Sequence, residues 1–352
     1  MRRFAARQLC CLLAVCLLGA SSGALAAERE TAAAHLDRTA AFLTEAVPAP
    51  TPGSVGGEWL ILGLVRAGHG LPEGGGQAYW TALEAHVTAC DGVLHERKYT
   101  EYARTILAVT ALGKDPRDVA GYDLLAPLGD FDKTIYQGLS GPAWALIALD
   151  SGGYALPEGA TASRARYVDE LLARQNGDGG FALSKGGASE ADMTAMVLQA
   201  LAPYREREEV SAAVAGGLGF LSSAQREGGA YDNGGVVTAE STAQVIIALC
   251  TLGVDLEAPQ FTKHGATALD GLLSLGAPEG GFRHVADGAA DQMATEQALL
   301  ALAAVEREQD GAAPLYQMRG DGDRGSEPRP LADIPVRWVL YVPLLLCLEA
   351  VR

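Results

Sequence analysis

Cysteine, basic side chains and aromatic rings are all scarce in this chain of 352 residues. Three of its six cysteines fall within the first 16 residues, which leaves Cys90, Cys250 and Cys347. An odd number of cysteines without paired spacing indicates neither a disulfide framework nor a zinc site. A Cys90–Cys250 disulfide and two separate buried thiols both stay open as interpretations.

Positive charge is scarce because 27 Lys and Arg stand against 43 Asp and Glu, a net charge of −16. A chain of this charge is not expected to bind nucleic acid or an anionic surface electrostatically. It would attract cations or cationic ligands, although a solvated acidic surface explains the same composition.

The first 26 residues have the organisation of a signal peptide. Three arginines among the first seven residues precede an apolar stretch at 9–20 that is short for a membrane span. Ala24-Leu25-Ala26 then forms a small-residue cleavage site. Removal of this segment would leave 24 basic against 43 acidic residues, a net charge of −19. We therefore expect an extracytoplasmic protein, secreted or membrane-anchored at the cell surface.

One short sequence recurs about every fifty residues. It reads QNGDGGF at 175–181, QREGGAY at 225–231 and GAPEGGF at 276–282. Self-similarity at this period indicates one structural unit that is used repeatedly. The glutamine is suited to bond a neighbouring helix end, and the aromatic ring is suited to pack between layers. We therefore assign a structural role to Gln175, Phe181, Gln225, Tyr231 and Phe282.

Apolar runs of helical character follow the recurring sequence, because Ala and Leu dominate them and β-branched alternation is rare. Five runs align on a final leucine and begin with threonine or proline, which suit helix starts. They cover 105–112, 142–149, 194–201, 242–249 and 295–302, and a degenerate sixth run covers 58–66. Helices that are apolar nearly all round are expected to be buried on both sides.

Amphipathic segments alternate with these runs and are expected to form an outer layer. They cover 29–46, 77–90, 116–125, 162–175, 205–225 and 262–275. The alternation predicts an all-α fold, a ring of helix pairs with a cavity at its centre.

The predicted ring occupies residues 28–313, and a charged, glycine- and proline-rich linker follows at 314–335. The last segment, 336–352, is apolar between 338 and 351, with an arginine on each side. This stretch is short for a span, so a tail anchor, a docked helix and the remnant of a longer tail remain open. Membrane association through 338–351 is the interpretation that the flanking arginines and Trp338 favour.

The pattern Gln-x-x-x-Gly-x-aromatic at 175–181 and 225–231, followed by an acidic residue and a Thr-Ala helix, resembles the repeat of the α/α-toroid superfamily. That superfamily contains squalene and terpene cyclases, protein prenyltransferase β-subunits and cobalamin carriers of the transcobalamin type. The resemblance covers roughly residues 30–310 and implies a toroid of about six inner and six outer helices built from repeats of about 50 residues. The chain looks most like exported bacterial proteins with prenyltransferase/squalene-oxidase repeats.

The cyclases that the chain resembles carry an Asp-x-Asp-Asp-Thr-Ala motif whose middle aspartate protonates an alkene. The matching stretch here is EADMTA at 190–195, in which Asp192 takes the place of the middle acid, while Glu190 and Met193 replace its neighbours. Methionine supplies no hydrogen-bond network for a strong acid. An aromatic content of 6% also disfavours a carbocation site. A helix-start residue that caps backbone amides is the simpler role for Asp192.

The prenyltransferases that the chain resembles hold zinc with Asp, Cys and His. The matching region at 280–296 offers His284, Asp287 and Asp291 but no cysteine. We therefore expect no metal site and no cofactor.

A concave small-molecule site at one mouth of the ring remains as the expected functional feature. The alignment places these candidate ligand-binding residues near that mouth: Tyr102, Arg104, Trp144, Asp192, Glu240, Gln244, Glu296 and Gln297. The leading hypothesis is non-catalytic binding of a bulky small molecule, with cobalamin as a candidate. There are two alternatives. One is a diverged cyclase or prenyltransferase with Asp192 as its acid, and the other is a structural or partner-binding repeat protein at the cell surface.

Overall fold

The computed structural model describes residues 32–319, which form a mostly helical structure with two short hairpins. The fold class is therefore all-α. The predicted signal peptide at 1–26 and the apolar segment at 336–352 lie outside the described residues. None of the described helices is both long and apolar enough to cross a membrane.

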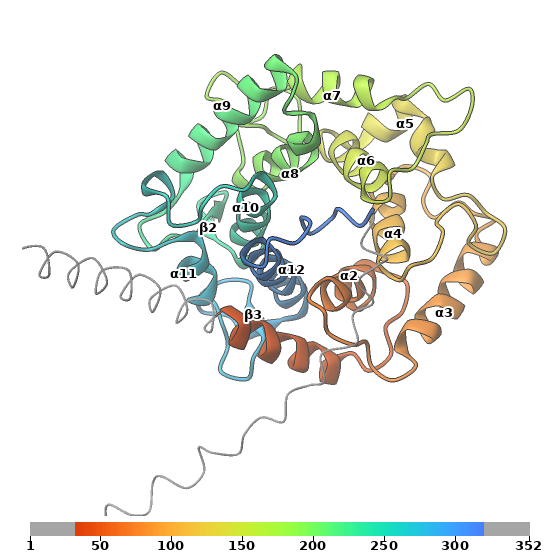
Figure 1. Ribbon diagram of the computed structural model, residues 1–352, viewed down its shortest axis with the longest axis horizontal. Coiled ribbons are helices and arrows are strands. Elements are labelled where there is room, and N and C mark those ends of the chain that lie inside the picture. The colour runs from red at the N-terminus through yellow and green to blue at the C-terminus, as the bar shows by residue number, and fades with distance from the viewer. Residues whose placement is uncertain (1–31, 320–352) are drawn as a thin grey trace, which may run out of the picture.

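Six helices of the described chain surround a common centre (Figure 1). They are α2 (Trp59–Arg66), α4 (Thr100–Ala111), α6 (Ser140–Ser151), α8 (Ala191–Leu201), α10 (Ala239–Leu252) and α12 (Gln292–Gln309). Each contacts the next in this order, and α12 returns to contact α2, so the circuit is closed. These inner helices cover the six predicted apolar runs to within one residue, and α6, α8, α10 and α12 are buried on nearly every side.

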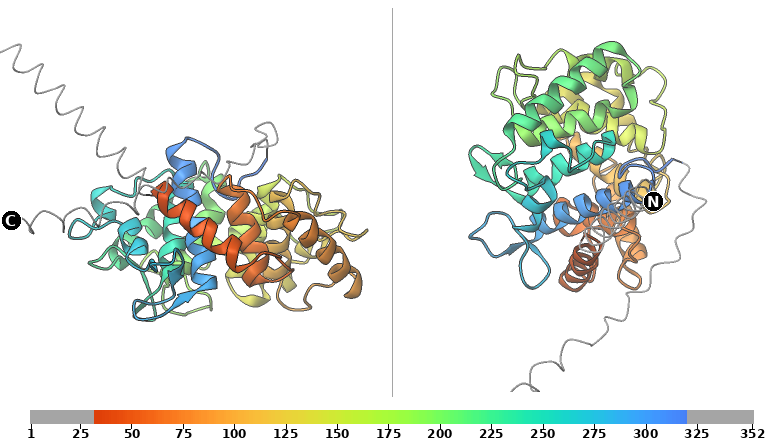
Figure 2. Two further views of the ribbon diagram at one scale, coloured as in Figure 1. Left: turned by 90° about the horizontal axis from the view of Figure 1, so that it is seen from below. Right: turned by 60° about the vertical axis from the view of Figure 1, so that its left-hand side comes forward.

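A second set of helices lies outside the first, and the side views in Figure 2 show the helix at 32–46 on the outer surface. The others are α3 (Gly75–Ala89), α5 (Phe131–Thr134), α7 (Arg164–Leu172), α9 (Glu208–Ala224) and α11 (Ala268–Leu273). Short helical turns are η1 (Ser54–Glu58), η2 (Ala126–Gly129), η3 (Ile135–Gln137), η4 (Ala202–Tyr204) and η5 (Pro259–Phe261). Two antiparallel hairpins, β1 (Asp232–Asn233) with β2 (Val236–Val237) and β3 (Phe282–Arg283) with β4 (Ala290–Asp291), precede α10 and α12.

The predicted outer helix at 116–125 is wrong, because that segment forms turns and the outer helix of this unit is the short α5. Asp115, Asp118 and Asp123 each accept a hydrogen bond from a backbone N–H two or three residues ahead. Such local bonds compete with helical ones. Ala120 also has a positive φ of 54°, which ends any helix there. The predicted helix at 262–275 is likewise reduced to α11, with a turn before it in which His264 has a positive φ.

The recurring sequence forms the same tight loop three times. In each copy the N–H of the second residue bonds the carbonyl of the sixth, as between Asn176 and Gly180. The glycine at the fifth position has a positive φ and lies against the next outer helix: a Cβ on Gly179 would meet the Gly216 oxygen at 2.5 Å. Only glycine combines this φ with so close an approach. The Gln175 amide donates to Ala213 in the same outer helix, α9, which confirms its expected structural role.

The third copy of the loop closes the outer layer. Gly280, with φ of 105°, would place a Cβ 3.1 Å from the Arg38 carbonyl oxygen, and Gly281 lies against the Phe42 ring. Both partners belong to the helix at 32–46, at the other end of the described chain. The copy that has lost its glutamine is thus the one that meets the first helix rather than the next repeat.

The threonines of the aligned runs do not mark helix starts, which corrects the sequence interpretation. Thr194, Thr242 and Thr295 each lie three residues inside their helix. Their hydroxyl oxygens accept the N–H of the loop aromatic residues Phe181, Tyr231 and Phe282 at 2.9–3.0 Å. The three rings are fully buried between the layers. The threonine therefore links the loop of its unit to the inner helix.

Cys90 and Cys250 are free thiols. Of the two interpretations that the sequence allowed, a disulfide and separate thiols, the structure has separate thiols. Cys250 is buried on α10, and burial raises the pKa of its thiol.

We expect Thr242→Val to destabilise the fold by about 1–3 kcal/mol, because it leaves the buried N–H of Tyr231 without an acceptor. Urea denaturation measures the change. The matched control is Thr251→Val on the same helix, since the Thr251 hydroxyl bonds only the Ile247 carbonyl. Equal effects of the two substitutions would contradict the linking role of Thr242.

Candidate functional site

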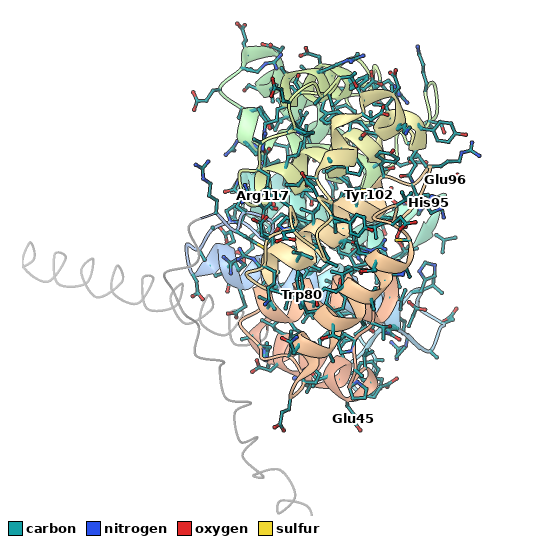
Figure 3. All side chains as sticks on the ribbon, turned by 90° about the vertical axis from the view of Figure 1, so that its right-hand side faces the viewer. Glu45, Trp80, His95, Glu96, Tyr102 and Arg117 are labelled. Atoms are coloured by element: carbon teal, nitrogen blue, oxygen red, sulfur yellow. The ribbon has the colours of Figure 1, made fainter. Side chains whose placement is uncertain are left out.

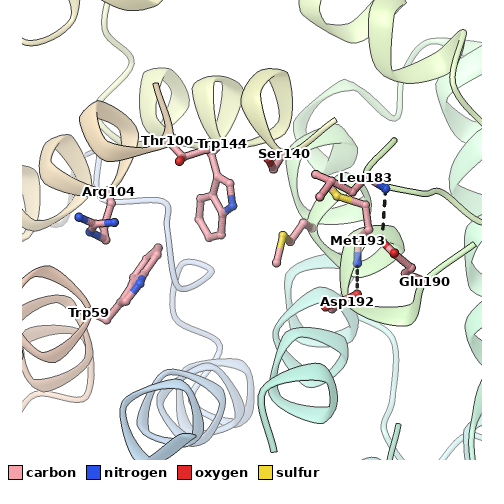
Figure 4. Close-up of a pocket in the computed structure, with 10 residues that line it drawn as sticks. Trp59, Thr100, Arg104, Ser140, Trp144, Leu183, Glu190, Asp192 and Met193 are labelled. Carbon is pink, nitrogen blue, oxygen red and sulfur yellow. Dashed lines mark hydrogen bonds between the residues drawn. The ribbon is translucent and has the colours of Figure 1, made fainter. Parts of the chain in front are cut away.

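A cavity of about 310 Å³ lies among the N-terminal parts of four inner helices, α2, α4, α6 and α8 (Figure 4). It is partly open to solvent and is lined by Trp59, Thr100, Arg104, Ser140, Trp144, Leu183, Glu190, Asp192, Met193 and Met196. The walls are mostly apolar, and a few polar groups converge on the space between them. This composition is usual for a small-molecule site.

Two tryptophans form one wall of the cavity (Figure 4). The rings of Trp59 and Trp144 are 5.2 Å apart between centroids and tilted by 51°. Tyr316 meets Trp144 edge-on at 5.6 Å, and its own ring is buried. The aromatic wall therefore joins α2, α6 and the C-terminal part of the described chain.

The segment around Tyr316 is bound tightly to the inner helices. The Arg66 guanidinium donates to the carbonyls of Pro314, Leu315 and Gln317, and the Met318 N–H donates to Ser151. Figure 1 shows this segment crossing the centre of the ring. The predicted linker at 314–335 therefore begins too early: Leu315 and Tyr316 are part of the packed core because they fill the space that the inner helices leave.

Asp192 and Glu190 stand at the opposite wall, at the start of α8 (Figure 4). The Asp192 carboxylate accepts the Met193 N–H at 2.8 Å and the Asn233 amide at 3.4 Å. Glu190 accepts the Leu183 N–H at 3.2 Å. Desolvation by burial raises the pKa of Asp192, against the backbone hydrogen bonds that lower it. The shift arises because the carboxylate has lost water without gaining a positive partner.

Arg104 is the cationic side chain of the cavity wall, and two carboxylates hold it. Its Nε donates to Glu58 at 3.0 Å and its Nη2 donates to Glu101. Burial acts to lower the pKa of Arg104, and these two partners more than offset it, so the pKa is raised. Glu58 is itself buried and accepts the Tyr79 hydroxyl and the Gly53 N–H. The Glu58–Arg104–Glu101 cluster thus carries one net negative charge.

The inner-helix alignment explains which predicted residues reach the cavity. Trp144, Gln244 and Gln297 occupy the same position, five residues before the final leucine of their runs. Met196 shares that position in α8. Trp59 shares it in α2 when that helix is aligned on Leu64. Trp59, Trp144 and Met196 line the cavity. Trp59 was missed because the degenerate first run hides this register.

Gln244 and Gln297 are not cavity residues, because they bond to each other at 2.8 Å between α10 and α12. Gln199 of α8 extends this buried amide chain by donating to Gln244. One half of the ring therefore carries bulky apolar residues around an open space, and the other half is closed by paired amides.

Tyr102 and Glu240 also lie away from the cavity. Tyr102, labelled in Figure 3 near His95, is buried against Tyr99 at 5.3 Å between ring centroids. Burial raises the pKa of Tyr102, although backbone hydrogen bonds from His95 and Leu94 oppose the shift. Glu240 pairs with the exposed His284 at 2.8 Å. Of the eight predicted residues, Arg104, Trp144 and Asp192 line the cavity.

Glu296 is fully buried and forms a separate acidic site beside Glu58. Its Oε1 accepts the Gly56 N–H at 2.7 Å and the Gln292 amide at 3.0 Å, while Oε2 has no hydrogen-bond partner. Desolvation by burial, reinforced by Glu58, raises the pKa of Glu296 to about 7. Glu58 and Glu296 occupy the same repeat position on adjacent helices, six residues before Leu64 and Leu302.

Within residues 32–319, no group of three or more His, Cys, Asp or Glu side chains is placed to hold a metal ion. Comparisons with known protein families and with curated proteins found no match to this chain.

The raised pKa of Glu296 predicts a pH-dependent stability. The unfolded carboxyl ionises near 4.5 and the folded one near 7, so between these values the folded state holds more protons. The free energy of unfolding should therefore fall by about 2–3 kcal/mol as the pH rises through this window. Glu296→Gln should lack this decline. Urea denaturation of both proteins at pH 4.5 and pH 8 measures the difference.

The control for the loss of one charge is Glu158→Gln at an exposed loop position. A constant difference between Glu296→Gln and the unsubstituted protein across the pH range would contradict the assignment of a buried proton to Glu296.

We expect Tyr316→Ala to destabilise the fold by about 3 kcal/mol, because a large buried ring beside Trp144 is lost. Tyr316→Phe should not destabilise the fold, because the buried hydroxyl has no hydrogen-bond partner to lose. Thermal denaturation followed by tryptophan fluorescence measures both. A large loss on Tyr316→Phe would show that the hydroxyl is bonded, and a small loss on Tyr316→Ala would show that the segment is not part of the core.

Proposed function

We propose that this chain is an exported α/α toroid, similar to terpenoid cyclases and prenyltransferase β-subunits, that binds a small molecule without transforming it. The observation that carries the binding function is the cavity between the two tryptophans and the start of α8. The closed circuit of inner helices and the threefold loop geometry support the toroid. Export rests on the signal-peptide pattern of the sequence.

The size of the cavity narrows the ligand class. About 310 Å³ lies at the lower end of the usual range for small-molecule sites, roughly 300–1,000 Å³. Tyr316 and the segment that Arg66 holds fill the space beyond Trp144. A corrinoid would exceed this volume and would have to lie across the mouth, so a smaller ligand fits the site better.

The non-catalytic assignment rests on the surroundings of Asp192. Its carboxylate bonds the N–H of Met193 in its own helix, which is the behaviour of a residue that stabilises a helix start. The adjacent Met193 and Met196 offer no hydrogen bonds that would prepare a strong acid.

An enzyme of the cyclase or prenyltransferase type is the second candidate, favoured by one observation. Burial raises the pKa of Asp192 and so promotes the protonated form that an acid catalyst needs. If this candidate is correct, Asp192→Asn abolishes turnover of a polyprenyl substrate.

Partner binding at the cell surface is the third candidate. All five of the exposed large hydrophobic side chains of the described residues lie in the segments that connect an outer helix to the following inner helix. They are Val55, Val93, Tyr136, Leu183 and Val236. Their common place before an inner helix is the observation that favours this candidate, since apolar surface near one end of the helices would suit a partner.

A thermal-shift titration tests the binding function, with small aromatic compounds, cobalamin and related corrinoids, and polyprenyl diphosphates. A ligand at a hundredfold excess over its Kd should stabilise the folded protein by about 2.7 kcal/mol. We expect small aromatic compounds to stabilise the protein, and Trp144→Leu to weaken their binding about fivefold because a ring contact worth roughly 1 kcal/mol is lost.

Trp80→Leu is the matched control, because Trp80 lies on the outer helix α3 against Lys114 (Figure 3). A response that is lost equally in both variants, or no response to any compound, would overturn the binding function at this cavity. A response to polyprenyl diphosphates alone would favour the enzyme.

A further inference from the structure

We propose that the cavity accepts an organic cation, an ammonium group that carries an aromatic or alkyl substituent. This inference rests on the proposed small-molecule binding and names the class of ligand. It follows from the distribution of charge around the cavity, from the aromatic wall, and from the apolar surface that remains.

The charges that line the cavity, together with the two carboxylates that hold Arg104, leave a net negative site. Arg104 is matched by Glu58 and Glu101, and that cluster is one negative charge in excess. Asp192 and Glu190 add carboxylates on the opposite wall. The net charge of the whole chain, −16, has the same sign and would raise the local concentration of cations.

Asp192 is a desolvated carboxylate of the cavity without a compensating charge. No basic side chain of residues 32–319 forms an ion pair with it, and its hydrogen-bond partners are the Met193 N–H and the Asn233 amide. A desolvated carboxylate is unfavourable until a positive charge approaches it. A bound cation would supply that charge.

The aromatic wall is suited to the same ligand. An ammonium group is attracted to the face of an indole within about 6 Å of the ring, and recognition of quaternary ammonium by aromatic side chains relies on this attraction. Trp59 and Trp144 present two indoles that are tilted by 51° to each other, and Figure 4 shows them across the cavity from Asp192. Aromatic rings on one side and a carboxylate on the other would enclose the positive group.

The rest of the lining selects for an apolar substituent. Met193 and Met196 are flexible and polarisable, and they adapt to ligands of irregular shape. Leu183 stands at the rim, where it is partly exposed. An anionic ligand, by contrast, would meet Asp192 and Glu190, and the Nε and Nη2 donors of Arg104 are already engaged.

Three probes of similar size test the inference on the full chain, with binding followed by tryptophan fluorescence and calorimetry. Benzyltrimethylammonium is the cation, neopentylbenzene is its uncharged isostere, and phenylacetate is an anion. We expect the cation to bind about tenfold or more tightly than the isostere, and phenylacetate to bind most weakly. Asp192→Asn should remove most of the preference for the cation.

Asp132→Asn is the matched control, since Asp132 is an exposed aspartate in the first turn of α5 and its loss changes the net charge equally. It should leave the preference unchanged. If Asp192→Asn fails to fold, the ranking of the three probes on the unsubstituted protein decides alone.

Tighter or equal binding of neopentylbenzene or phenylacetate would overturn the cation inference while leaving small-molecule binding in place. An equal loss of preference in Asp132→Asn would also overturn it, because the attraction would then come from net charge. Binding of none of the probes would overturn the inference as well, and the thermal-shift response to other compounds would still decide the proposed function.

Discussion

The hydrogen bond from the loop N–H to a threonine inside the inner helix is the interaction on which the ring depends. It occurs between Phe181 and Thr194 and recurs between Tyr231 and Thr242 and between Phe282 and Thr295. On the other side of each loop, a glycine of positive φ lies against the next outer helix, as Gly179 does against α9. One loop therefore connects its own inner helix to the following unit. Because the third loop meets the helix at 32–46, these local links also close the outer layer.

Because the ring is closed, side chains at the same repeat position lie around one centre. Their residue types differ between the two sides of the ring, and so does their packing. Trp59 and Trp144 contact each other and leave a space between their rings and the start of α8, whereas Gln244 and Gln297 bond directly across α10 and α12. A buried amide needs a partner, so a glutamine at this position draws its neighbour closer, while an indole or thioether is satisfied by apolar contact alone. The cavity is thus confined to one side of the ring.

Electrostatics gives the two acidic sites different characters. Glu296 is enclosed beside Glu58, and one of its carboxyl oxygens has no hydrogen-bond partner. Its surroundings therefore favour the protonated carboxyl group. Asp192 faces a space that a ligand can enter, so the same desolvation there favours an incoming positive charge. A ligand can reach Asp192 but not Glu296, so the proposed cation would bind between Asp192 and the aromatic wall. The segment around Tyr316 limits how deeply a ligand can enter.

The sequence by itself determined the all-α class, the six inner runs and the packing role of Gln175, because periodicity and tight-turn residues act locally. It also placed Arg104, Trp144 and Asp192 near one another through their repeat positions. The turns at 116–125 were missed although their cause is local, namely aspartate side chains that bond nearby backbone N–H groups. Only the tertiary structure decided that Leu315 and Tyr316 enter the ring and that Glu58 pairs with Arg104. These features depend on contacts between segments far apart in the chain, such as Arg66 with Leu315, for which sequence spacing carries no signal.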